Sequence, residues 1–205
     1  MRYVNLYLLL IAVLMMTACA SQGGGGSVAT TSRTSSALPR VSVQEQYQQA
    51  LQLMKSGRNS EAEVILTKLV KRHPRYTGPL TNLGIMAAKN RQFESAKRYF
   101  SKAIAAKRDN IIALTWIAQV CEELGELQAA EMWLKQAIAR KPDHATAYLN
   151  LAILYDTGLS QPADALEYYR QYLELNGDSE LPVAAWARDL QEKLESRRVA
   201  TADAR

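Results

Sequence analysis

The sequence has little of what most enzymes use at their active sites. Histidine occurs only at His73 and His144, and neither has a cysteine, carboxylate or second histidine at the spacing of a metal site or a catalytic triad. The run of four glycines at 23–26 has no strand and helix around it, as a phosphate-binding loop requires. We therefore expect no enzymatic activity, no metal and no cofactor.

The sequence also lacks a concentrated basic surface. Its formal net charge is +5, but Lys and Arg are spread among acidic residues, and no basic run is interleaved with aromatic residues. This distribution argues against nucleic acid as a partner. The densest basic stretch, 68–75, lies where a helix is expected to end, so its cations complement the helix dipole; a lipid-binding or partner-binding patch is the alternative.

Phenylalanine and proline are scarce, with two Phe and six Pro in 205 residues. This composition favours a helical domain over a sheet-built one. Apolar residues make up 48% of the chain, which is enough for a buried core. The composition therefore indicates one folded helical unit.

Small residues recur at fixed positions along most of the chain. Residues 77–110 can be laid over 111–144 without a gap, and the same frame extends back over 43–76 and forward over 145–178. A period of about 34 residues is typical of helix-turn-helix repeats. Helices that cross closely need small side chains at the crossing. Such residues stand at the eighth position (Ala50, Gly84, Ala118, Ala152) and at the twentieth (Ala62, Ala96, Ala130, and Ala165 after one extra residue).

Glycine and proline mark the ends of the expected helices. Gly57 and Gly125 fall at the turn inside their repeats, and Pro74 and Pro142 follow the second helix. Gly84 falls inside a helix instead, where glycine costs about 1 kcal/mol against Ala, so we infer a packing reason for it.

This set of positions resembles the tetratricopeptide repeat. The resemblance implies an all-α fold, a right-handed α-solenoid of four helix pairs (43–76, 77–110, 111–144 and 145–178). In the fourth pair, segment 155–162 adds one residue, which we place in the turn between its helices. The matching residues of the third repeat are Leu114, Ile117, Ala118, Gly125, Ala130, Leu134, Ala137 and Pro142.

One more helix, 179–197, is expected to cap the solenoid, with Ser179 as its N-cap and a frayed tail at 198–205. Its apolar residues, Val183, Trp186, Leu190 and Leu194, fall on one face. We therefore expect Trp186 to belong to the core.

The N-terminus has the features of a secretory signal, because Arg2 precedes an apolar run over 6–16 that is too short to span a membrane. Residues 16–19, Met-Thr-Ala-Cys, resemble the lipobox of bacterial lipoproteins. That resemblance implies removal of a signal peptide at 1–18 and acylation of Cys19. An ordinary cleaved signal with an incidental cysteine is the alternative. The absence of Asp after Cys19 is similar to the signal for outer-membrane sorting in enterobacteria, which implies a lipid-anchored protein on the periplasmic face.

Residues 19–42 follow as the lipidated cysteine and a Gly-, Ser- and Thr-rich tether without apolar periodicity. If Cys19 carries lipid, Cys121 has no cysteine to pair with. Cys121 occupies a packing position of its repeat, so we expect a buried, inert thiol.

First helices line the concave face of such a solenoid, and the repeat frame therefore identifies candidate binding residues. Asn82 and Asn150 offer amides that could bond the backbone of an extended peptide. Trp116 is either a binding hot spot or a packing residue between repeats, and both readings stay open. Glu122 and Glu123 are expected on solvated surface, without an apolar pocket that would raise a pKa. The candidate groove residues are Tyr47, Gln48, Leu51, Asn82, Ile85, Lys89, Trp116, Gln119, Asn150 and Ile153.

A lipobox followed by tetratricopeptide repeats resembles the pilotin lipoproteins. This resemblance implies a scaffold that binds a protein or extended peptide in its groove and aids assembly of a type IV pilus or secretion machine, with the membrane contacted through the N-terminal lipid. The alternative is an adaptor that recruits peptidoglycan hydrolases or a periplasmic protease to the outer membrane.

Overall fold

The computed structural model describes residues 41–176 and 181–203. The predicted signal peptide, Cys19, most of the tether and the N-cap at Ser179 lie outside these residues. None of the helices in the described ranges has the length and apolarity needed to cross a membrane.

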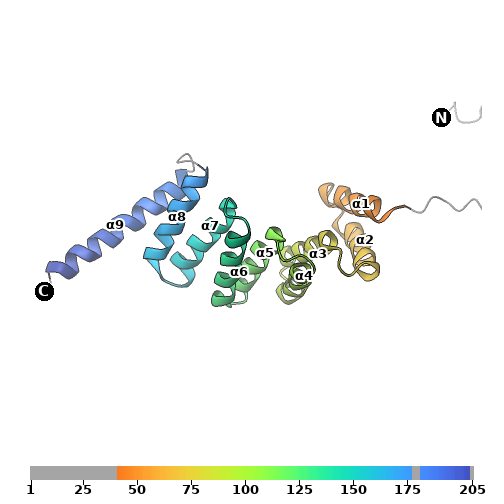
Figure 1. Cartoon of the computed structure of the whole chain (residues 1–205), viewed down its shortest axis with the longest axis horizontal. Helices are drawn as coiled ribbons and strands as arrows, with labels where there is room; N and C mark the ends of the chain where they lie inside the picture. Colours follow the sequence, from red (N-terminus) through yellow and green to blue (C-terminus); the bar gives the residue numbers. More distant parts are fainter. Residues whose placement is uncertain (1–40, 177–180, 204–205) are drawn as a thin grey trace, which may run out of the picture. The chain divides into compact units, whose positions relative to one another are not determined.

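Every regular element in the described ranges is helical, and each helix packs against the next one along the chain (Figure 1). The first helices of neighbouring pairs also meet, α3 with α5 and α5 with α7. The expected all-α solenoid is therefore confirmed. Its elements are α1 (Val43–Lys55), α2 (Asn59–Arg72), α3 (Thr77–Lys89), α4 (Phe93–Ala106), α5 (Ile111–Glu123), α6 (Leu127–Arg140), α7 (Ala145–Ile153), the π-helix η1 (Leu154–Gly158), α8 (Pro162–Asn176) and α9 (Leu181–Asp203).

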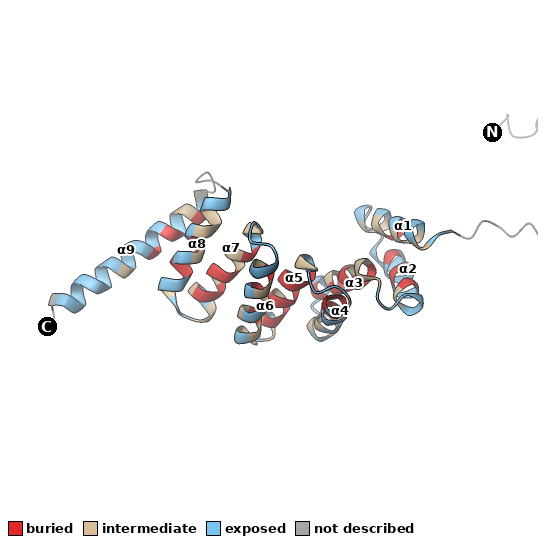
Figure 2. Ribbon diagram, in the orientation of Figure 1, coloured by how far each residue is buried: buried red, intermediate tan, exposed pale blue. Residues whose placement is uncertain are grey.

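The recurring small residues lie where the helices touch, and buried positions line the helix sides that face one another (Figure 2). All seven alanines of the eighth and twentieth positions are completely buried. At Gly84, a Cβ atom would lie only 2.6 Å from Cε1 of Phe100. The inferred packing reason for this glycine is therefore confirmed.

The turn inside each pair needs one residue with a left-handed backbone. Gly57 (φ 78°) and Gly125 (φ 75°) supply it in the first and third pairs, where glycine adopts this conformation without a steric penalty. Arg91 (φ 57°) and Ser160 (φ 54°) take the same role in the second and fourth. These two turns therefore hold a side chain in a conformation that favours glycine.

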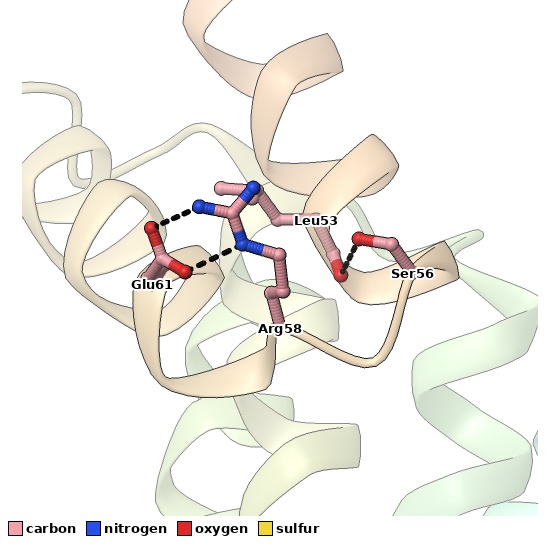
Figure 3. Close-up of polar contacts among 4 residues, drawn as sticks. All are labelled: Leu53, Ser56, Arg58 and Glu61. Atoms are coloured by element: carbon pink, nitrogen blue, oxygen red, sulfur yellow. Dashed lines mark hydrogen bonds and ion pairs between the residues drawn. The ribbon is translucent and has the colours of Figure 1, made fainter. Parts of the chain in front are cut away.

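Polar side chains secure the turn between α1 and α2 (Figure 3). The Ser56 hydroxyl donates to the Leu53 carbonyl at 3.0 Å at the end of α1. Arg58 precedes α2, and its guanidinium donates to both carboxylate oxygens of Glu61, at 2.6 and 2.7 Å. Both side chains are exposed, so solvent screens their attraction and the pair adds little to stability.

The extra residue of the fourth pair does not lie in the turn, as the sequence suggested, but inside the first helix. It widens the end of α7 into the π-helix η1, where the amide of Leu159 donates to the carbonyl of Leu154 at 2.8 Å. Leu154 and Tyr155 are buried while Thr157 is exposed. The wider turn thus keeps both apolar side chains in the core and places the additional residue at the surface.

Helix α9 packs on α8 and differs from the expected capping helix in two ways. The helix extends to Asp203, beyond the expected end at residue 197. Trp186 is 48% exposed, with its ring tilted against Tyr169 at 6.2 Å between centroids, so its assignment to the core is wrong. The buried stripe passes instead through Val183, Ala187 and Leu190, and Trp186 lies beside it.

Candidate functional site

Two of the predicted groove residues, Tyr47 and Asn82, bind each other. Nδ2 of Asn82 donates to Oη of Tyr47 at 2.8 Å and to the carbonyl of Gly78 at 3.2 Å. The Tyr47 ring lies over Gly78, where a Cβ atom would be 2.7 Å from the ring. The sequence predicts the Asn82 amide as a donor to a peptide ligand, but in the structure its nitrogen joins α3 to α1.

Five other predicted residues lie elsewhere on the first helices. Gln48 is exposed, and Leu51 and Ile85 are partly buried. Nδ2 of Asn150 is buried and has no hydrogen-bond partner among the described residues. Ile153 lines a separate pocket of about 320 Å³, together with Trp186 of α9.

The remaining three predicted residues, Lys89, Trp116 and Gln119, line one pocket of about 580 Å³, which we call the α3–α5 pocket. It lies where the end of α3 and the start of α4 face α5. Its lining includes Lys89 of α3, Phe93 of α4, and Trp116, Gln119, Glu122 and Glu123 of α5.

Trp116 both packs against the core and lines this pocket. Its ring stacks on that of Phe100, with 6.4 Å between centroids and 19° between planes, and Phe100 is completely buried. The side chain of Trp116 is itself only partly buried. The packing reading is therefore confirmed for one face of the ring, and the face toward the pocket is the part of Trp116 for which binding to a partner stays a prediction.

Glu122 is a pocket residue that the sequence analysis missed. Its Oε1 is buried without a hydrogen-bond partner among the described residues. Burial, and secondarily the charge of Glu123, raise the pKa of Glu122 to about 7. The expectation that Glu122 lies on solvated surface is therefore wrong, although Glu123 is exposed as expected. Glu122 occupies the twelfth position of its repeat, which belongs to the concave face, and this position could have indicated a pocket residue.

A guanidinium lies at the edge of the pocket. The side chain of Arg91 extends over the Phe93 ring, with Cζ 5.4 Å from the ring centroid, and its Nη2 lies 3.8 Å from Oε2 of Glu123. Arg91 has the left-handed backbone that glycine provides in the first and third pairs. Non-glycine residues held in this region are concentrated at functional sites.

Cys121 lies beside these residues on α5 but does not reach the pocket. It is a free cysteine and completely buried. Burial is the largest cause that raises the pKa of its thiol to about 11. The thiol is therefore protonated at neutral pH, in agreement with the expected inert cysteine.

Sequence comparison identifies the repeats. Tetratricopeptide repeat models match residues 79–110 and 109–176. Residues 79–176 of the solenoid are thus built from tetratricopeptide repeats, and the helix pair α1–α2 precedes the matched residues. Proteins with such repeats are generally protein-binding scaffolds without catalytic activity. No curated protein matches the chain in a sequence search.

Solved structures share this architecture. The chain is similar to PilF of Pseudomonas aeruginosa (TM-score 0.66, 22% identity, over 75% of this chain and 69% of that one). It is similar to MamA of Desulfovibrio magneticus RS-1 (TM-score 0.66, 19% identity, 78% and 89%). It also resembles a thermophilic tetratricopeptide repeat protein of Thermus thermophilus (TM-score 0.59, 25% identity, 73% and 81%). At these identities the likeness establishes the fold alone.

Proposed function

We propose that this protein is a lipid-anchored scaffold on the periplasmic face of the outer membrane. In this proposal it holds a protein partner in the α3–α5 pocket and aids the assembly of a type IV pilus or secretion machine. The observation that carries the proposal is the pocket itself, which gathers three predicted groove residues around a tryptophan platform. The choice of machine rests on the resemblance of a lipobox followed by such repeats to the pilotin lipoproteins.

The chemistry of the pocket suits a protein segment. A tryptophan fixed from behind by Phe100 offers apolar area at little entropic cost, which is a property of binding hot spots. Lys89, Gln119 and Glu123 add a cation, an amide and a carboxylate for the polar groups of a partner. A volume of about 580 Å³ lies within the range of ligand-binding clefts.

The anchor rests on the sequence around Cys19. The lipobox-like residues 16–19 precede a Gly- and Ser-rich stretch that leads to the first repeat. Glycine, serine and threonine are typical of linkers, so we expect this stretch to act as a tether. Such a tether lets the repeats reach a partner that lies at some distance from the membrane surface.

Photo-crosslinking in living cells tests the partner. A photoreactive residue replaces Gln119, which lines the pocket while leaving Trp116 intact, and mass spectrometry identifies the captured proteins. The same residue at Lys102, exposed on α4, is the control. Capture of a pilus or secretion subunit from position 119 alone is the expected result. Capture of a wall hydrolase or protease would favour the adaptor function instead, and equal capture from both positions would contradict binding at the pocket.

Replacement of Cys19 by Ser tests the anchor. Without the thiol no acyl chain can be attached, so the protein should appear in the soluble periplasmic fraction with an unchanged circular dichroism spectrum. A Cys19→Ser protein that stays with the outer membrane would show that lipid does not hold it there. The Cys121→Ser variant is the matched control and should remain in the membrane fraction.

A further inference from the structure

The α3–α5 pocket is lined by two aromatic rings, Phe93 and Trp116, and by two carboxylates, Glu122 and Glu123. The guanidinium of the protein's own Arg91 lies over the Phe93 ring and 3.8 Å from the Glu123 carboxylate. Trp116 and Glu122 line the same pocket, and Oε1 of Glu122 is buried with no hydrogen-bond donor among the described residues. Arg91 thus shows that a guanidinium can lie near an aromatic ring and a carboxylate of this pocket at the same time.

We propose that the partner protein inserts an arginine side chain into the α3–α5 pocket, where its guanidinium donates to Glu122 and stacks on Trp116. This proposal rests on the proposed function, since it requires a protein partner at the pocket. It goes further by naming the side chain that the pocket selects.

Arginine fits these groups better than the other side chains. Its planar guanidinium presents paired N–H donors to a carboxylate and stacks on an aromatic face. An acidic side chain would meet the charge of Glu122 and Glu123, and a neutral amide would leave the buried carboxylate without a counter-charge. A lysine supplies the charge but lacks the planar fork.

The state of Glu122 agrees with this assignment. Burial without a partner disfavours its charged form, and a guanidinium at Oε1 would favour that form again. Lys89 is exposed at the same pocket and can donate to backbone carbonyls beside the inserted arginine. The pocket therefore suits an arginine within an otherwise uncharged segment.

Four matched peptides test the proposal: acetyl-Ala-Leu-Arg-Ala-amide and its relatives with citrulline, lysine or glutamate in place of arginine. Citrulline keeps the shape of arginine and removes its charge. Each peptide is titrated into the full-length, ¹⁵N-labelled protein in detergent micelles, and binding is followed at the indole N–H of Trp116. A Trp116→Phe variant assigns this signal. We expect the arginine peptide to bind about tenfold or more tightly than the citrulline peptide.

Variants of the two neighbouring carboxylates locate the contact. Glu122→Gln should reduce the affinity for the arginine peptide to that for the citrulline peptide. Glu123→Gln should change it less than about threefold, because Glu123 is exposed and already lies near Arg91. Retention of the arginine preference in Glu122→Gln would overturn the proposal, as would equal affinities for arginine and citrulline or the absence of any shift at Trp116.

The two proposals can fail separately. If position 119 captures a partner in cells while the peptides show no preference for arginine, the scaffold function stands and the arginine assignment is wrong. If position 119 captures nothing, the partner site itself is wrong. A final test replaces each exposed arginine of a captured partner, one at a time, with glutamine. Glutamine is used because citrulline is not genetically encoded and glutamine also carries a neutral amide. The proposal requires that one such exchange abolish the crosslink.

Discussion

The ring of Phe100 fills the space that a side chain at Gly84 would need. A Cβ atom at Gly84 would lie 2.6 Å from Cε1 and 2.8 Å from Cδ1 of that ring. At the equivalent positions the first and third repeats have an alanine and a leucine, Ala50 and Leu66 in one and Ala118 and Leu134 in the other, and all four are completely buried. The size of one residue is thus matched to the size of the other.

Gly84→Ala should therefore destabilise the protein by about 1–3 kcal/mol, because the added methyl group must displace the ring of Phe100. Introducing Phe100→Leu into the Gly84→Ala variant recreates the pair found in the first and third repeats and should recover most of this loss. Urea unfolding monitored by circular dichroism measures all the variants.

Phe100→Leu alone is the control, and it should cost about 1 kcal/mol or more through the space it leaves. The four proteins form a double-mutant cycle, and a coupling energy near zero would contradict the size matching.

A second prediction concerns the left-handed residues of the turns. Nothing lies within 4 Å of a Cβ atom at Gly125, so Gly125→Ala tests the backbone alone. With φ at 75°, it should cost about 1 kcal/mol. Ser160→Gly should change stability in the opposite direction, by about 0.5 kcal/mol, since φ at Ser160 is 54°. Thermal unfolding measures both, and a less stable Ser160→Gly variant would show that the serine side chain stabilises the turn.

A third prediction tests the junction of the first two repeats. Tyr47→Phe removes the hydroxyl that accepts from Asn82 Nδ2 and should cost about 1 kcal/mol. Tyr76→Phe is the matched control, because its hydroxyl donates to the exposed Gln44 and its loss should matter less than about 0.5 kcal/mol. Hydrogen exchange of α1 is the measurement. Equal protection of α1 in the two variants would argue against the bond as the link between α1 and α3.

The fold could be predicted from the sequence because close packing restricts residue size. Only Gly or Ala fits where two helices touch, so the period appears directly in the printed letters, as at Gly84 and Ala118. Position in the frame then fixes the side of the helix, which is why the sequence predicts Lys89, Trp116 and Gln119 on the same face of the solenoid. They line one pocket because each occupies a concave-face position of a neighbouring first helix.

The 34-residue period does not predict the exposure of every side chain. It fails where the surroundings of a residue depend on a neighbouring side chain that differs from repeat to repeat. The sequence predicts Glu122 and Glu123 as one solvated pair, but adjacent helical residues point about 100° apart, so one can enter a pocket while the other meets solvent. The same angle separates the exposed Trp186 from the buried Ala187. For Asn82, the repeat frame predicts a concave-face position but does not specify the hydrogen bond to Tyr47 of the preceding repeat.

A fourth prediction concerns Cys121. Because the thiol is completely buried and its pKa is raised to about 11, a thiol reagent at pH 8 should modify it only after unfolding. The measurement is the rate of reaction with a chromogenic disulfide, with and without urea, in the Cys19→Ser variant, where no other cysteine remains. A fast reaction without urea would show that α5 opens in the folded protein.

The last prediction follows from the unpartnered carboxylate of Glu122. Its pKa is raised from an ordinary value of 4.5 to about 7 in the folded protein. Its contribution to stability is therefore fully present below about pH 4.5 and is lost as the pH rises through 7. Glu122→Gln cannot ionise, so it should unfold at a higher temperature than the parent protein at pH 8 and at nearly the same temperature at pH 4. Glu63→Gln, the same substitution at an exposed carboxylate of α2, is the control. Parallel profiles for Glu122→Gln and the parent would mean that Glu122 is as well solvated in the folded state as in the unfolded one, and the pocket would then lack the buried acceptor that an incoming arginine requires.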